Sequence, residues 1–251
     1  MSHESRIGQG FDTQTAEQSQ FKERPAPLFD VINICGKAGS GTSTLVKGLQ
    51  ERFQKEGYDV EVIIKGKILR DESIQTSGQD FTDYYRRETS KDVDIDTTTA
   101  NTLMNSGNKG KIIIMDSRLG GWISKKLFDA GSQIYARHTS ILLTARASTR
   151  YQRVYTRKVE EARQRGETLP QYLSVVRETR RRDEKDMGQF VKTYPELEGI
   201  DILSPRNRDE KGEPIYHKTI NTTTMEKSEI IDLAEAIVKA RGLVSQPRRA
   251  S

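Results

Sequence analysis

Short apolar segments alternate with longer amphipathic segments over most of the chain. The apolar segments have strand length and polar boundaries, and they cover residues 28–35, 59–64, 111–116, 140–144 and 216–221. Helical spacing of apolar side chains marks residues 44–53, 146–165, 169–194 and 226–241. Strands separated by helices of this length predict a doubly wound α/β fold around a parallel sheet.

Polar segments flank this pattern at both ends. Residues 1–27 are rich in Gln, Ser, Thr and Glu and are predicted to form a flexible arm with a short helix near residues 14–21. Residues 242–251 are predicted to form a flexible tail, which leaves 28–241 as the globular domain. Inside it, residues 199–214 are polar and interrupted by prolines and a glycine, so they are predicted to be a loop or an insertion.

A glycine-rich segment separates the first predicted strand from the first predicted helix, and it reads Gly36-Lys37-Ala38-Gly39-Ser40-Gly41-Thr42-Ser43. Strand, glycine loop and helix form the context of a phosphate-binding loop, because the glycines let consecutive backbone N–H groups face a phosphate. Ser43 stands where a hydroxyl would bind Mg²⁺. The alternative is a glycine-rich turn without a ligand, and the flanking elements together with both end residues favour phosphate binding.

One position departs from the usual loop, since Thr42 stands where a lysine normally precedes the Ser or Thr. The loop therefore keeps its backbone cradle and its metal ligand but lacks its cation. Three sources could supply the charge: Lys37 within the loop, arginines from elsewhere in the chain, or a lysine from a partner chain.

Composition narrows the class of protein. The 251 residues carry a net charge of +5, which suits either nucleic acid or a site for several phosphates. The single cysteine, Cys35, permits no intrachain disulfide, and the three histidines are scattered, so we expect a reducing compartment and no structural zinc. The first residues show no signal pattern and no apolar run approaches membrane length, so we expect a cytoplasmic protein without a membrane partner.

Polar residues follow several of the predicted strands. In a doubly wound sheet, ligands bind at the carboxyl ends of the strands, where Gly36, Gly66 and Asp116 are expected. Two predicted helices nearby, 146–165 and 169–194, are rich in arginine. Such helices are often only solvated surfaces, but beside a phosphate loop the guanidinium forks suit the charge of a transferred phosphoryl group.

Several of these segments together resemble the P-loop nucleoside monophosphate kinases, most closely the archaeal-type cytidylate kinases, from about residue 31 to residue 238. The segment Asp116-Ser117-Arg118-Leu119-Gly120-Gly121-Trp122 is the most specific match. The other similar segments are Ser40–Ser43, Lys65–Arg70, Asp94–Asp96, Arg150–Arg153, Arg182-Asp183, Tyr194 and Tyr216–Thr222. The resemblance implies a sheet of this kinase type with a helical monophosphate-binding insert at 66–106 and an arginine-rich lid with its following helix at 146–194.

The resemblance also implies roles for individual residues. The backbone of Gly36–Thr42 would hold the phosphates of ATP, while Ser43 and Asp116 would bind Mg²⁺. Gly66, Arg70 and Arg118 would hold the acceptor monophosphate. Asp183 would recognise the base or orient Arg182. Arg150, Arg153 and Arg182 would close over the transferring phosphoryl group, with Asp116 orienting the metal through water.

The sequence departs from the family at Met187, Gly188 and Gln189, where the family has arginines, and residues 131–137 look like a further insertion. Three hypotheses therefore stay open. They are an ATP-dependent kinase for CMP or dCMP, a kinase of this type for another nucleotide or small substrate, and a non-catalytic nucleotide-binding or nucleic-acid-binding regulator. Arg70 and Arg118 together with a lid favour the kinases, so nucleic acid is not favoured as a partner, and a monomer or weak dimer is expected.

Overall fold

The computed structural model describes residues 29–64, 109–129, 136–209 and 211–243 of the chain. The predicted arm at 1–27, its helix and most of the tail lie outside these residues. So does the whole of the predicted insert at 66–106, including Gly66 and Arg70. None of the described helices is long and apolar enough to cross a membrane.

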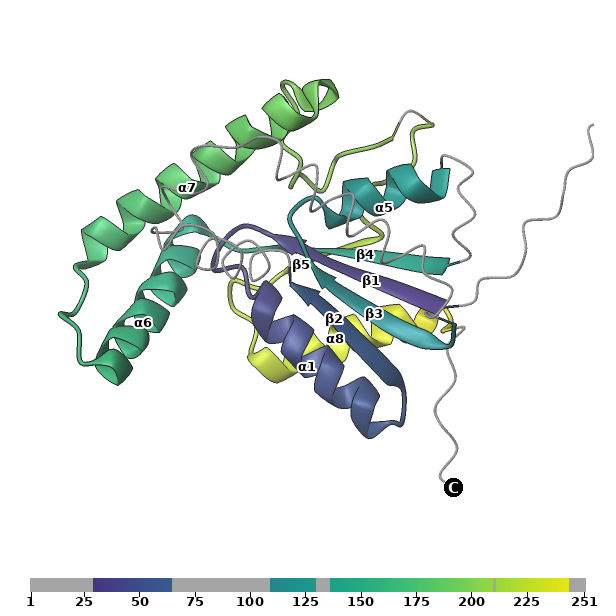
Figure 1. The fold of residues 1–251 in the computed structure, drawn as a ribbon, viewed down its shortest axis with the longest axis horizontal. Helices are drawn as coiled ribbons and strands as arrows, with labels where there is room; N and C mark the ends of the chain where they lie inside the picture. The colour runs from purple at the N-terminus through teal and green to yellow at the C-terminus, as the bar shows by residue number, and fades with distance from the viewer. Residues whose placement is uncertain (1–28, 65–108, 130–135, 210, 244–251) are drawn as a thin grey trace, which may run out of the picture.

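A parallel sheet of five strands in the order β2-β3-β1-β4-β5 forms the centre of the described fold (Figure 1). The strands are β1 (Phe29–Gly36), β2 (Asp59–Ile64), β3 (Lys111–Asp116), β4 (Ala136–Thr144) and β5 (Lys218–Asn221). After β1 the chain passes to β2 and β3 on one side of β1, and it then crosses to β4 on the other side. This reversal creates a crevice at the carboxyl end of β1, where ligands bind in folds of this kind.

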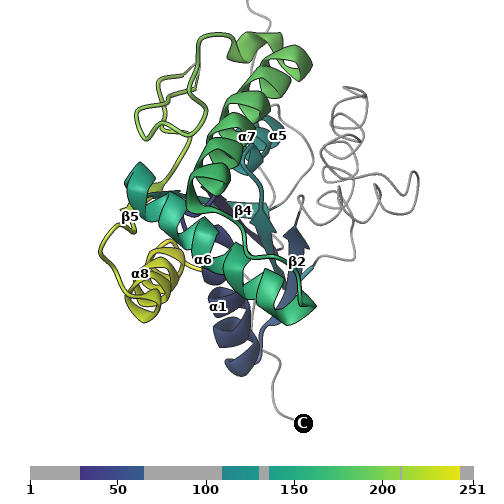
Figure 2. The same ribbon diagram turned by 90° about the vertical axis from the view of Figure 1, so that its left-hand side faces the viewer.

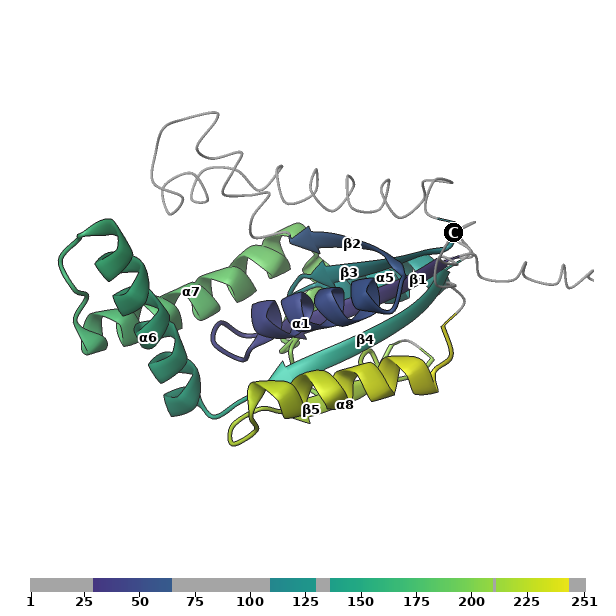
Figure 3. The same ribbon diagram turned by 90° about the horizontal axis from the view of Figure 1, so that it is seen from below.

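Helices cover both faces of the sheet, which confirms the predicted doubly wound α/β fold. On one face, α1 (Thr42–Lys55) and α8 (Lys227–Ala240) lie side by side (Figure 3). They pack on a cluster of strand side chains that includes Ile32, Ile34 and Ile114. The other face is covered by α5 (Gly120–Asp129) together with the end of α7 (Tyr172–Thr193) and the 3₁₀ turn Pro195–Leu197. Both faces of the central strands are therefore buried, which explains their continuous apolar sequences.

A helical hairpin lies beyond the carboxyl ends of the strands (Figure 2). It consists of α6 (Ala147–Arg165) and α7, which coincide closely with the predicted arginine-rich helices. Val154, Ala162 and Val175 are buried in the hairpin, while most of its charged residues are exposed. The hairpin therefore stands over the crevice at the end of β1.

The structure changes the interpretation of two segments. β4 begins at Ala136, four residues before the predicted strand at 140–144, and Arg137 pairs with Asp30 of β1. Residues 199–214 form a loop as predicted, but the side chain of Ile202, which belongs to this loop, is fully buried. Its carbonyl oxygen accepts hydrogen bonds from Trp122 Nε1 at 3.2 Å and Tyr216 Oη at 2.6 Å. This loop therefore belongs to the core that supports α5.

Two histidines contact each other edge to face on β4 and just before β5. The ring centroids of His138 and His217 are 4.9 Å apart. Burial, strengthened by the positive charge of Arg241, lowers the pKa of His138 to about 4 and that of His217 to about 3. His217 Nδ1 accepts a hydrogen bond from the backbone N–H of Ser140 at 2.9 Å, which requires an unprotonated nitrogen. Both rings are therefore neutral in the folded protein at pH 7.

This pair predicts how stability depends on pH. In the unfolded chain the histidines take up protons near pH 6.5, whereas in the folded protein they stay neutral down to about pH 4. We expect the free energy of unfolding to be largest above pH 7 and to fall as the pH drops below 6.5. The slope should be at most about 1.4 kcal/mol per pH unit for each histidine, and less because both rings are only half-buried. Urea unfolding from pH 7.5 to 5 measures this slope. The double variant His138→Gln/His217→Asn should flatten it, and an unchanged slope would assign the effect to other groups.

Candidate active site

The glycine-rich segment forms a tight loop between β1 and α1. Ser40 N donates to Lys37 O at 3.0 Å, and Gly41, with φ of +104°, is the N-cap residue that precedes α1. Gly39 has φ of +80°, and a Cβ atom on it would lie 2.3 Å from the carbonyl oxygen of Arg150. The loop therefore needs glycine at position 39 for both backbone conformation and space. With α1 starting at Thr42, the loop has the geometry of an anion-binding helix N-terminus.

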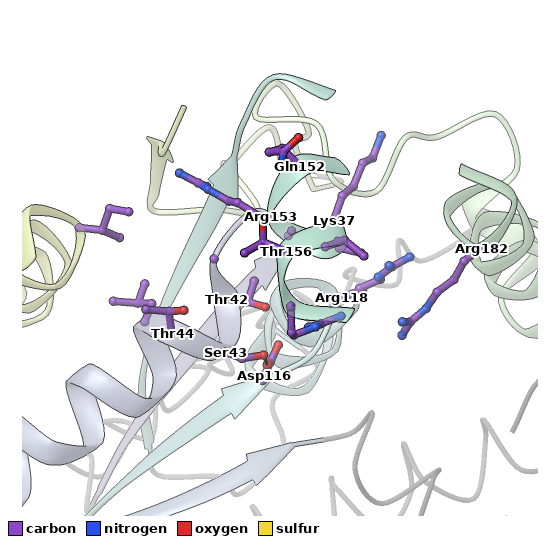
Figure 4. A pocket seen from close by; sticks show the side chains of 18 of the residues that line it. Lys37, Thr42, Ser43, Thr44, Asp116, Arg118, Gln152, Arg153, Thr156 and Arg182 are labelled. Atoms are coloured by element: carbon purple, nitrogen blue, oxygen red, sulfur yellow. Dashed lines mark hydrogen bonds between the residues drawn. The ribbon is translucent and has the colours of Figure 1, made fainter. Parts of the chain in front are cut away.

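Ser43 and Asp116 meet at the carboxyl edge of the sheet, as predicted. Ser43 Oγ lies 3.1 Å from Asp116 Oδ2, and the two side chains point toward each other (Figure 4). A hydroxyl and a carboxylate are oxygen donors of the kind that Mg²⁺ prefers. The donor set therefore fits Mg²⁺, held by Ser43 directly and by Asp116 directly or through water.

Two arginines of the first turns of α6 support the loop. Arg150 is buried, and its Nη1 donates to Ala38 O at 2.8 Å. Arg153 donates to Thr222 O at 2.7 Å and to Thr222 Oγ1 at 3.0 Å. Thr222 Oγ1 in turn donates to Ser40 O at 2.8 Å. The loop carbonyl groups of Ala38 and Ser40 therefore accept hydrogen bonds from two different side chains. This role of Thr222 was not predicted, because a threonine that follows a strand carries no distinctive signal.

A cluster of arginines and aspartates lies beside the loop. Arg118 Nη2 is 3.1 Å from Asp183 Oδ1, and the other terminal nitrogen of Arg118 pairs with Asp186. Asp183 Oδ2 accepts a hydrogen bond from Arg150 Nη1 at 3.0 Å. Arg182, whose orientation was one of the two roles predicted for Asp183 beside recognition of the base, lies 3.9 Å from Asp186 and keeps 46% of its side chain exposed. The structure therefore joins Arg118, Arg150 and Asp183 in one network, with Arg182 at its outer edge.

The position of Lys37 bears on the missing loop lysine. Its Nζ lies 3.6 Å from Asp201 Oδ2, and both side chains are largely exposed, so the pair adds little stability. Figure 4 shows Lys37 and Arg153 directed away from Ser43 and Asp116. Lys37 and Arg118 both line the cavity that contains Ser43 and Asp116.

A cavity of about 1900 Å³ brings these parts together. Its wall includes the loop, Asp116, Arg118 and the facing sides of α6 and α7, among them Arg177, Arg181 and Arg182. It also includes residues that were not singled out from the sequence, namely Thr223, Thr224, Met225, Ile230 and Ile231. This second group lies just before α8 and in its first turns, and its apolar members belong to or pack against the core beneath α1 and α8.

The fold and the site define a P-loop domain of the kinase-like α/β class. The chain belongs to the AAA domain family AAA_18, whose sequence profile matches residues 32–185, from β1 into α7. No curated protein sequence matches the chain.

Solved structures resemble this fold at low sequence identity. An uncharacterized protein from Eubacterium ventriosum is 16% identical, with a TM-score of 0.50, over 84% of this chain and 98% of that chain. A putative kinase from Chloroflexus aurantiacus is 14% identical, with a TM-score of 0.49, over 85% and 98% of the two chains. A gluconokinase from Sinorhizobium meliloti is 14% identical, with a TM-score of 0.43, over 85% and 94%. At these identities the likeness concerns the fold alone.

Proposed function

We propose that this chain transfers a phosphoryl group from Mg–ATP to a nucleoside monophosphate, with CMP and dCMP as the preferred acceptors. The observation that carries the proposal is the single cavity that joins the phosphate loop, the Ser43–Asp116 pair and Arg118. A donor phosphate on the loop and an acceptor phosphate beside Arg118 would then face each other across the metal ligands. The preference for cytidine nucleotides rests on the resemblance of the segment Asp116–Trp122 to cytidylate kinases.

The proposed roles combine the family resemblance with the positions of the described residues in and beside the cavity. The backbone N–H groups of residues 36–42 and the start of α1 would bind the donor phosphates. Mg²⁺, held by Ser43 and Asp116, would offset phosphate charge when bound. Arg118 would bind the acceptor phosphate, and Arg182, which lines the same cavity, would approach the transferring group. Arg150 and Arg153 would act by holding the loop, and the predicted insert at 66–106, with Arg70, would complete the acceptor side.

This chemistry needs positioning and charge more than proton transfer. The acceptor is already an anionic phosphate, so a general base is not required. The cations that line the cavity would stabilise the charge that spreads over the transferring phosphoryl group. Closure of the α6–α7 hairpin would exclude water and so protect the donor from hydrolysis.

A coupled assay of ADP release across a panel of nucleoside monophosphates tests the proposal. We expect the highest kcat/KM with CMP and dCMP. The variant Ser43→Ala, purified in parallel, controls for contaminating kinases because it lacks the proposed metal ligand. Much faster turnover of AMP or UMP than of both cytidine nucleotides would contradict the substrate assignment. Tight binding of Mg–ATP without turnover of any acceptor would favour a non-catalytic regulator.

A further inference from the structure

Asp183 lies between the two sides of the proposed active site. Its Oδ1 is 3.1 Å from Arg118 Nη2, on the acceptor side, and its Oδ2 is 3.0 Å from Arg150 Nη1, on the loop side. The three side chains are only 9–16% exposed. In a site this dry, charge-assisted hydrogen bonds are strong, so one carboxylate holds both guanidinium groups in place.

The contact continues from Arg150 into the phosphate loop. The same nitrogen, Arg150 Nη1, donates to Ala38 O at 2.8 Å. The backbone of Arg150 is also packed so closely on the loop that position 39 has no room for a Cβ atom. A path of direct polar contacts therefore runs from Arg118 through Asp183 and Arg150 to the backbone that would bind the donor.

We propose that Asp183 is a positioning residue that couples the acceptor side at Arg118 to the shape of the phosphate loop. The identity of the acceptor rests on the function proposed above, but the path itself does not. Asp183 acts through Arg118 and Arg150 and does not need to touch either substrate.

The sign of the coupling follows from competition for one guanidinium. An acceptor phosphate that binds Arg118 competes with Asp183 for its N–H groups. The negative charge of Asp183 is then offset mainly by Arg150, and the hydrogen bond between these two side chains strengthens. Arg150 is thereby held more firmly on Ala38 O, which favours the loop shape that binds the donor. Acceptor and donor should therefore raise each other's affinity by the same factor.

Asp186 provides a matched control for this proposal. It lies on the same helix, is 12% exposed, and pairs with the same arginine, Arg118. The two aspartates differ in their second arginine: Asp183 accepts a hydrogen bond from Arg150, which contacts the loop, whereas Asp186 lies 3.9 Å from Arg182 on its own helix. Asp183→Asn and Asp186→Asn are both isosteric and both remove one negative charge beside Arg118, so a difference between them reports the connection to the loop.

The first measurement is the affinity for Mg²⁺ and a non-hydrolysable ATP analogue, with and without the monophosphate that the panel assay identifies. In the unchanged protein and in Asp186→Asn, we expect the monophosphate to tighten analogue binding about fivefold or more. In Asp183→Asn, the tightening should fall below about twofold. Equal tightening in both variants, or none in the unchanged protein, would overturn the proposal.

The second measurement does not depend on any acceptor. Hydrogen exchange of the amides of residues 36–41 reports how firmly the loop is held. We expect exchange about fivefold faster in Asp183→Asn than in Asp186→Asn, as for the loss of one hydrogen bond. Equal exchange rates would overturn the proposal even if a monophosphate is phosphorylated. Faster exchange without turnover of any monophosphate would support the path and refute only the proposed function.

Discussion

Gly39→Ala is expected to weaken binding of Mg²⁺ and an ATP analogue by on the order of 100-fold or more, because aligned N–H donors are lost. The added Cβ would lie 2.3 Å from Arg150 O and 2.9 Å from Arg150 C. The clash is between the backbone of the loop and the backbone of α6, and neither can move aside as a flexible side chain can. The left-handed φ of +80° adds about 1–2 kcal/mol of strain for alanine. The loop would have to refold, and its N–H groups would no longer converge.

Isothermal titration calorimetry measures this loss, and Gly166→Ala is its control. Gly166 also has a left-handed φ, of +66°, but a Cβ atom there meets no atom within 4 Å. It follows the end of α6, away from the loop. Gly166→Ala should lower the free energy of unfolding by about 1–2 kcal/mol and leave the affinity unchanged. Similar affinities for the two variants would show that the loop has more room than its geometry indicates.

Arg118→Ala is expected to lower kcat/KM for the preferred monophosphate by on the order of 100-fold or more while the protein stays folded. A guanidinium that pairs with a phosphate in a partly dry site is worth about 2–4 kcal/mol of transition-state binding. The fold should persist because each aspartate keeps a cationic neighbour. Asp183 keeps Arg150, and Asp186 keeps Arg182.

Steady-state kinetics and the melting temperature together test this prediction. Arg180→Ala serves as the control, because Arg180 lies on the arginine-rich helix α7, is 73% exposed and pairs with Glu184. Arg180→Ala should leave kcat/KM and the melting temperature near those of the unchanged protein. Near-normal kcat/KM for Arg118→Ala at an unchanged melting temperature would remove Arg118 from the active site.

The strand pattern was readable from the sequence wherever apolar residues alternate with polar ones or follow one another without a break. The predicted strands at 59–64 and 111–116 have the same bounds as β2 and β3. The start of β4 was missed because Ala136, Arg137, His138 and Thr139 are small or polar and show no apolar run. Their strand conformation depends on pairing with β1, which is a tertiary effect that a local pattern does not contain.

The part of the site that depends on local motifs and on strand order was predictable from the sequence. The loop, Ser43 and Asp116 meet because parallel strands end at one edge, so strand order and motif suffice. The link through Asp183 joins residues from α6, from α7 and from the turn before α5, and no spacing along the sequence encodes it. For the same reason, the sequence left the role of Asp183 open between recognition of the base and orientation of Arg182, and it did not indicate the contacts with Arg118 and Arg150.

The anchoring of α6 determines where the hairpin is stiff. Arg150 and Arg153 fasten its first turns to the phosphate loop and to the end of β5, and Asp183 fastens the neighbouring part of α7. Rotation about the base of the hairpin would break all of these contacts at once. Farther out, α6 and α7 touch through the Tyr155–Tyr172 ring contact and the exposed Lys158–Glu178 pair. The hairpin is therefore fixed most firmly at the end that contacts the phosphate loop. Bending of α6 and α7 along their length should cost less free energy than rotation of the whole hairpin about that end.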